Sequence, residues 1–151
     1  KMVVADIGPK PYEMRHQHII EALDSLDFNR IKTRREADDF LAEKIPDLPI
    51  RQFLLKNLQR TDKNTLGLKL NLEALKKNIH HVLDDMSDYK IDVPTLFLRG
   101  SNSNYILAED EIQIREHFPN SFFATIPNAG HWLHAEKPDE FYRLTMGFLT
   151  R

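Results

Sequence analysis

The stretch Asn128-Ala-Gly-His-Trp-Leu-His-Ala-Glu-Lys-Pro138 places His131 on a glycine-containing loop near the C-terminus of the chain. The apolar run 122–126 leads into this loop, and a segment of helical character, 138–149, follows it. Loops held between regular elements often carry functional groups. Histidine can accept and release protons near neutral pH. The stretch therefore predicts a strand, a loop with a candidate general base, and a helix.

The segments just before this stretch repeat the same alternation. The apolar run 93–98 is typical of a buried strand and stops at Arg99-Gly100, and 108–118 has the spacing of a helix. Followed by the strand 122–126 and the helix 138–149, this order predicts a parallel sheet with right-handed crossovers.

The N-terminus adds one more strand, predicted at 2–5 and followed directly by Asp6. A buried parallel strand needs a neighbour on each side. We therefore expect the chain to be the C-terminal part of a longer polypeptide, whose N-terminal half would supply the missing neighbour.

Between the first strand and the later ones the apolar spacing is mainly helical. Helices are predicted at 12–27, 34–44, 49–59 and 71–85, the last capped by Asn71. The range 65–70 is ambiguous, because its leucines alternate as in a strand but Gly67 disfavours one. The predicted fold class is α/β, a parallel sheet with an inserted helical cap. Residues 1–10 would form a core strand and exit loop, 11–86 the cap, and 87–151 the rest of the core.

Composition limits the classes of function. The chain has 151 residues, 41% hydrophobic and 29% charged, with a net charge of -2 and no cysteine. Interspersed charges of both signs argue against a nucleic-acid partner. No apolar run approaches the roughly 20 residues that span a bilayer, and the N-terminus does not resemble a signal peptide. These features favour a cytoplasmic protein without a membrane partner.

Two residues carry the candidate chemistry. In open parallel sheets, reacting groups gather beyond the carboxyl ends of the strands. Asp6 follows one strand and His131 follows another, so we expect both at the same edge of the sheet. Alone, such a histidine is more often structural and such an aspartate more often a cap. Their combination favours an acid–base pair.

No nucleophile accompanies this pair. The chain has five serines, and none lies between glycines in a Gly-x-Ser-x-Gly pattern. They are Ser25, Ser87, Ser101, Ser103 and Ser121. The histidine pairs His16/His18 and His80/His81 lack a carboxylate at ligand spacing, so neither a metal nor another cofactor is expected.

Several segments resemble a known family. The stretch 128–138 looks like the histidine loop of α/β-hydrolases, and Pro94-Thr-Leu-Phe-Leu-Arg-Gly100 resembles the strand before it. Val4-Ala-Asp-Ile-Gly-Pro9, Asn71-Leu-Glu-Ala-Leu75 and Gly100-Ser-Asn-Ser-Asn-Tyr105 resemble the small esterase branch, which includes the bacterial YbfF-type esterases and their mitochondrial abhydrolase-domain relatives.

The resemblance implies a serine hydrolase with a Ser–Asp–His triad, in which His131 is the general base. In most α/β-hydrolases the acid lies in a Gly-x-x-Asp turn, but the turn 100–104 has no carboxylate here. In this branch the acid is implied at Asp6, with Glu73 as its rival. The implied serine lies upstream of Met2, outside this chain, so the chain alone is expected to be inactive.

The resemblance also implies substrates and their contacts. The substrates would be short- to medium-chain carboxylic esters or thioesters, hydrolysed without a cofactor. Trp132, Tyr105, Phe53 and Leu54 are candidate substrate-binding residues, although such side chains more often pack in a core. The alternative function is a non-catalytic ligand-binding or scaffold module on the same fold.

Overall fold

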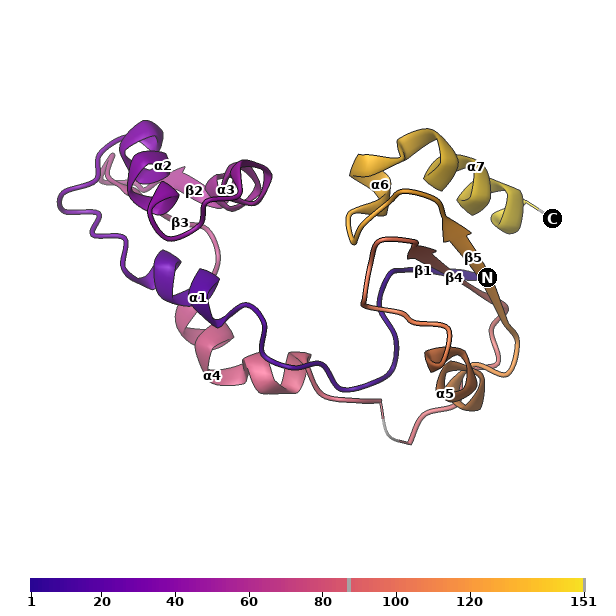
Figure 1. The fold of residues 1–151 in the computed structure, drawn as a ribbon. Helices are drawn as coiled ribbons and strands as arrows, with labels where there is room; N and C mark the ends of the chain where they lie inside the picture. The colour runs from indigo at the N-terminus through magenta and orange to yellow at the C-terminus, as the bar shows by residue number, and fades with distance from the viewer. Residues whose placement is uncertain (87, 151) are drawn as a thin grey trace. The chain divides into compact units, whose positions relative to one another are not determined.

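The computed structural model describes residues 1–86 and 88–150. The chain divides into two compact units (Figure 1). We call Lys1–Pro11 with Asp85–Arg151 the sheet unit, and Tyr12–Asp84 the helical unit. Each is described here by itself.

The sheet unit is built on three parallel strands, β1 (Met2–Ala5), β4 (Thr95–Gly100) and β5 (Ser121–Ile126), in the order β1-β4-β5. Both β1 and β5 pair with β4 in parallel. The carboxyl ends of all three strands therefore lie at one edge, as the sequence predicted.

The central strand β4 is buried on both faces because its side chains alternate between two hydrophobic clusters. Leu96 and Leu98 pack on one face with residues of α6 (Leu133–Glu136) and α7 (Pro138–Leu149). Phe97 packs on the opposite face with Ile114 of α5 (Asp110–His117). Figure 1 shows α5 on one side of the sheet and α6 and α7 on the other.

The bounds of the last helix match the predicted range 138–149, so that prediction is confirmed. The short helix α6 was not predicted, because four residues are too few to show a helical period. It lies within the stretch that carries His131, and Leu133 at its start is fully buried.

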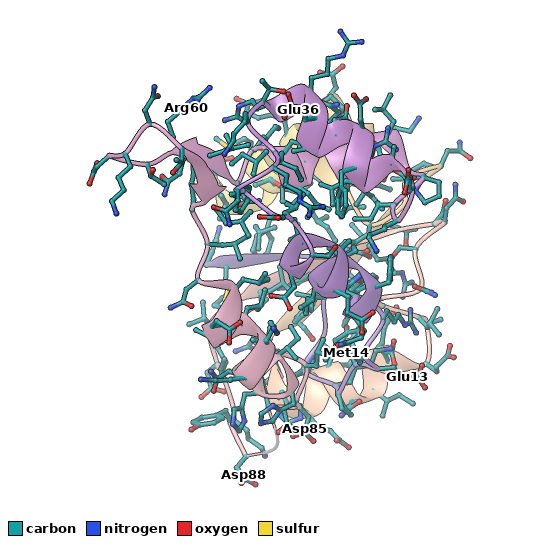
Figure 2. The ribbon with its side chains drawn as sticks, turned by 90° about the vertical axis from the view of Figure 1, so that its left-hand side faces the viewer. Glu13, Met14, Glu36, Arg60, Asp85 and Asp88 are labelled. Atoms are coloured by element: carbon teal, nitrogen blue, oxygen red, sulfur yellow. The ribbon has the colours of Figure 1, made fainter. Side chains whose placement is uncertain are left out.

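The helical unit contains four helices and a small antiparallel hairpin around one hydrophobic cluster. These elements are α1 (Gln17–Asp24), α2 (Arg34–Ala42), α3 (Leu48–Leu55), β2 (Leu58–Arg60), β3 (Leu66–Leu68) and α4 (Leu72–Val82). Figure 2 shows Glu36 on α2 and Arg60 at the end of β2. The assignment of this unit as a cap stays a prediction. No helix within the described residues is long and apolar enough to cross a bilayer.

The predicted helix 49–59 was wrong at its end. Helix α3 stops at Leu55, and Leu58 begins a strand that pairs with Leu68. The backbone N–H of Lys69 also donates to the carbonyl of Asn57 at 2.7 Å. Pairing with the second strand of the hairpin outweighs the local helical spacing.

Side-chain caps explain where three of these helices begin. Thr33, Asp47 and Asn71 each accept a hydrogen bond from a backbone N–H in the first turn of α2, α3 and α4. The predicted capping role of Asn71 is therefore confirmed.

Candidate active site

Asp6 lies directly after β1, where the chain turns away from the sheet. Its φ of 51° is in the left-handed region, which aspartate adopts more readily than most residues. Its N–H donates to the carbonyl of Leu98 at 2.8 Å, so the aspartate is still tied to β4. Its side chain is 0% exposed. The local backbone thus directs the Asp6 carboxylate toward the protein interior, at the carboxyl edge of the sheet.

His131 lies on the loop after β5, at the same edge. Its Nδ1 is 2.9 Å from Oδ2 of Asp6, although 125 positions separate the two residues in sequence. The His131 side chain is 40% exposed. When Nδ1–H donates to the carboxylate, Nε2 carries a lone pair that can accept a proton.

The Asp6 carboxylate has two further donors besides His131. The N–H of Gly100 donates to Oδ1 at 3.3 Å, and the Ser103 hydroxyl donates to Oδ2. A buried carboxylate is costly unless such donors replace the water it has lost. Three groups from the strand ends therefore converge on one buried carboxylate.

Ser103 lies in the turn 100–104, which the sequence marked only as lacking a carboxylate. Its hydroxyl oxygen also accepts the N–H of Tyr105 at 3.2 Å. Sequence reasoning missed this contact with Asp6. The available signal was its place three residues after Gly100, where a Gly-x-x-Asp turn carries its acid.

The ring of Tyr105 covers one face of the imidazole. The ring centroids of Tyr105 and His131 are 3.8 Å apart with planes inclined by 15°, a stacked arrangement. Trp132 follows His131 directly in sequence and is partly buried. Substrate binding by Tyr105 and Trp132 stays a prediction.

The loop before His131 is tied to the turn after β4. The N–H of Asn102 donates to the carbonyl of Ala129 at 2.9 Å, and the N–H of Asn128 donates to Oγ of Ser101 at 2.8 Å. A Cβ on Gly100 would lie 2.3 Å from the carbonyl oxygen of Ala129. Only glycine allows this close approach.

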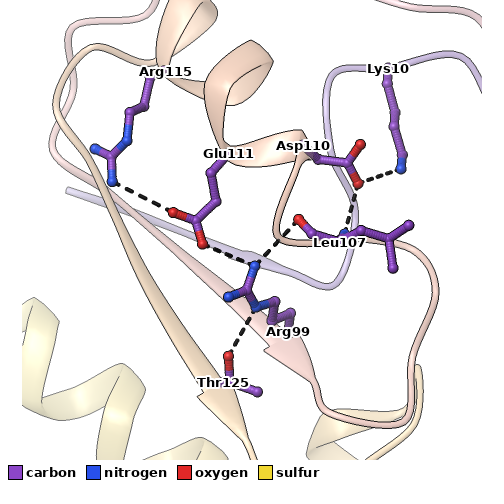
Figure 3. A network of polar contacts seen from close by, with 7 residues as sticks. All are labelled: Lys10, Arg99, Leu107, Asp110, Glu111, Arg115 and Thr125. Carbon is purple, nitrogen blue, oxygen red and sulfur yellow. Dashed lines mark hydrogen bonds and ion pairs between the residues drawn. The ribbon is translucent and has the colours of Figure 1, made fainter.

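A polar network joins the two ends of the segment between β4 and α5, at Arg99 and Leu107 (Figure 3). Arg99 at the end of β4 donates to Thr125 of β5 at 2.9 Å and forms an ion pair with Glu111 at 3.0 Å. Asp110 accepts the N–H of Leu107 at 2.7 Å and pairs with Lys10. The network joins two strands, the exit loop and the start of α5.

The remaining candidates lie in the helical unit. Leu54 is buried in its hydrophobic cluster, whereas Phe53 is 54% exposed. A role in substrate binding stays a prediction for both. Glu73, the rival acid, has a side chain that is 68% exposed and 3.2 Å from Nζ of Lys76. Asp6 is the carboxylate that the structure brings to His131.

No serine of the described residues donates to Nε2 of His131. Of the serines at this edge, Ser101 bonds to Asn102 and Asn128, and Ser103 bonds to Asp6. Ser87 lies outside the described residues. Within 1–86 and 88–150, no group of three or more His, Asp or Glu side chains could hold a metal ion.

Comparisons with known proteins point to one family. The chain is 34% identical over 156 residues to the sn-1-specific diacylglycerol lipase ABHD11 of Danio rerio and 29% identical over 150 residues to esterase YbfF of Escherichia coli. These matches cover 99% of the chain in both cases and 49% and 57% of the two relatives. The chain thus spans about half the length of the curated relatives that it matches. No protein-family model matches the chain.

A solved structure agrees with these relatives. The structure of a marine microorganism esterase superposes with a TM-score of 0.93 at 39% identity, over 98% of this chain and 60% of that one. The parallel sheet, the histidine loop and these similarities lead to the same conclusion. The chain belongs to the α/β-hydrolase superfamily, in its esterase branch.

Proposed function

We propose that the chain supplies the acid and the base of a serine esterase or thioesterase. The observation that carries this proposal is the 2.9 Å contact between Asp6 Oδ2 and His131 Nδ1 at the carboxyl edge of the sheet. The buried carboxylate would hold the Nδ1–H tautomer and stabilise the imidazolium that forms during the reaction.

The reaction would proceed by acyl transfer. A serine outside these 151 residues attacks the carbonyl carbon of the ester, and Nε2 of His131 takes its proton. His131 then gives the proton to the departing alcohol or thiol, which leaves an acyl-enzyme. Water attacks the acyl-enzyme with His131 again as base, releasing the acid and restoring the serine.

The proposed substrates are short- to medium-chain carboxylic esters or thioesters. Support comes from the resemblance to the esterase branch and from the aromatic ring of Tyr105 beside the proposed base. An apolar wall next to the reacting atoms suits an acyl chain better than a charged group. No metal or other cofactor takes part in the proposed mechanism.

A fluorophosphonate label on the full-length protein tests the proposal, since it reacts with an activated serine. We expect labelling and hydrolysis of a p-nitrophenyl ester, both lost in His131→Ala. In Asp6→Asn, kcat should fall by about 10³- to 10⁴-fold, because asparagine cannot hold the imidazolium. The 151-residue chain alone should hydrolyse nothing.

The same experiment separates the enzyme from the non-catalytic alternative. A ligand-binding or scaffold module would give neither labelling nor hydrolysis in the full-length protein. Ester hydrolysis by the chain alone that survives both Asp6→Asn and His131→Ala would overturn the proposed roles.

A further inference from the structure

One carboxylate holds the backbone on both sides of His131. Oε2 of Glu136 accepts the N–H of Gly130 at 2.7 Å, and Oε1 accepts the N–H of Trp132 at 3.2 Å. These N–H groups belong to the peptide units before Gly130 and after His131. Glu136 therefore uses both of its oxygens on the short segment that carries the imidazole.

The opposite side of this segment is held by the turn after β4. A Cβ on Gly100 would lie 2.4 Å from the carbonyl oxygen of Gly130, so the two backbones are in close contact. The N–H of Asn102 bonds to the carbonyl of Ala129. The turn thus engages the carbonyl groups of the segment, while Glu136 engages its N–H groups.

The contacts of Glu136 differ from those of an ordinary surface ion pair. Its carboxylate accepts from two backbone N–H groups, and hydrogen bonds to an ionised acceptor are stronger and shorter than neutral ones. Glu136 itself is exposed, so water could replace it without leaving a buried group unpaired. Its main effect is therefore on the orientation of the segment and less on the stability of the fold.

We propose that Glu136 is a positioning residue that sets the orientation of the His131 imidazole. The inference rests on the proposed function, because it assumes that His131 is the base. Glu136 fixes the peptide units around His131, and this keeps Nδ1 toward Asp6 and Nε2 toward the reacting atoms. Small errors in such geometry slow a reaction strongly.

The test compares Glu136→Ala and Glu136→Gln in the full-length protein. Alanine removes both acceptors, whereas glutamine keeps one oxygen and presents an amide donor in place of the other. If Glu136 acts through position, Glu136→Gln should lose less kcat than Glu136→Ala. If it acts only through charge, both variants should be equally impaired. Glu116→Gln on α5 is the matched control, because Glu116 is also exposed and lies in the same unit.

The first readout is steady-state ester hydrolysis. We expect Glu136→Ala to lower kcat by about 10- to 100-fold, the effect of a misplaced catalytic group, with KM changed less than about twofold. Glu136→Gln should fall between alanine and wild type, and Glu116→Gln should match wild type.

The second readout is the low-field proton NMR signal of Nδ1–H in His131, which reports its hydrogen bond to a carboxylate. The signal should be present in wild type and in Glu116→Gln, and absent in Asp6→Asn. In Glu136→Ala it should broaden or vanish. A merely structural role for Glu136 would leave the signal in place while lowering the unfolding temperature.

The results separate failure of this inference from failure of the proposed function. If wild type gives no Asp6-dependent signal and no hydrolysis, the proposed function fails. If wild type gives both and the two Glu136 variants keep the signal and at least half of kcat, Glu136 is not a positioning residue.

If Glu136→Ala does not fold, the positioning role of Glu136 is tested with the variants Gly130→Ala and Glu136→Gln instead. A Cβ on Gly130 would lie 3.0 Å from Oε1 of Glu136 and push against the carboxylate. We expect a partial loss of kcat with a broadened Nδ1–H signal. Full activity in both variants would overturn the inference.

Discussion

The hydroxyl of Ser103 donates a hydrogen bond to Oδ2 of Asp6, the same oxygen that faces Nδ1 of His131. Ser103 belongs to the turn after β4, and Asp6 follows the neighbouring strand β1. The proposed acid therefore has a partner from the turn after β4 and another from the loop after β5, so its orientation does not depend on the histidine alone.

Removing the Ser103 hydroxyl should slow ester hydrolysis in the full-length protein. We expect Ser103→Ala to lower kcat/KM by roughly 10- to 100-fold, since a hydrogen bond to a charged group contributes about 1.5–3 kcal/mol. Ser103→Thr keeps the hydroxyl and should retain most of the activity. Unchanged kinetics in the alanine variant would show that Gly100 and His131 are sufficient to orient Asp6.

The stacking of Tyr105 on His131 predicts that the ring matters more than the hydroxyl. An aromatic pair contributes about 0.5–1.5 kcal/mol beyond the area it buries, so Tyr105→Leu should reduce kcat by about 2- to 12-fold. Tyr105→Phe keeps the ring and should stay within about twofold of wild type. Equal losses of kcat in the two variants would show that the hydroxyl of Tyr105, and not its ring, is responsible.

Gly100 should not tolerate a side chain. Its Cβ would meet the carbonyl oxygens of Ala129 and Gly130 at 2.3 and 2.4 Å, and backbone atoms cannot move aside cheaply. We expect Gly100→Ala to lower the free energy of unfolding by about 1–3 kcal/mol in urea titrations, as overpacking does. The variant should also displace the histidine loop and lower kcat.

Gly147 provides the control for this substitution. It lies in α7, where an added Cβ would have no neighbour within 4 Å. Gly147→Ala should raise the free energy of unfolding by about 0.5–1 kcal/mol, because alanine loses less backbone freedom in a helix. Destabilisation by both substitutions to the same extent would contradict the close contact at Gly100.

The lowered pKa of Glu36 predicts that the stability of the helical unit depends on pH. The backbone N–H of Lys32 donates to Oε2 of Glu36 at 2.7 Å, and this bond is the largest cause that lowers the pKa of Glu36 below its ordinary value of 4.5. Folding then favours the ionised form. The contribution of ionised Glu36 to the free energy of unfolding is fully present above its ordinary pKa. It is lost as pH falls through the lower pKa of Glu36 in the folded chain.

Replacing Glu36 by glutamine should remove this contribution. The free energy of unfolding of Glu36→Gln should lie slightly below that of wild type at pH 6, and the two should converge as pH falls below the lowered pKa of Glu36 in the folded chain. Urea unfolding at several pH values measures the difference. Because Glu36 is exposed, the difference should be small and should shrink further in salt. A difference in the free energy of unfolding that does not change with pH would show that the effect comes from the shape of the side chain and not from its charge.

The sequence predicted the parts of this structure that follow from local pattern. The run 122–126 lies within β5 and 138–149 is a helix. The run 93–98 overlaps β4, but that strand continues through Arg99 to Gly100, where the sequence had predicted its end. The meeting of Asp6 and His131 followed from the predicted order of strands, because parallel strands bring their carboxyl ends to one edge.

The contacts that were missed depend on the paths of loops. Ser103 reaches Asp6 only because the turn after β4 folds back over the end of β1. Glu136 reaches the backbone around His131 only because α6 forms within the histidine loop. Neither path has a periodic pattern in the sequence, so neither contact could be derived from spacing.

The end of β1 and the turn after β4 deliver side chains to a single point beside the imidazole. A carboxylate in the turn after β4, at position 103, would therefore lie beside the same imidazole as the carboxylate of Asp6. The same imidazole is therefore within reach of an acid from either of two strand ends, and the place of the acid in space is fixed more tightly than its place in the sequence.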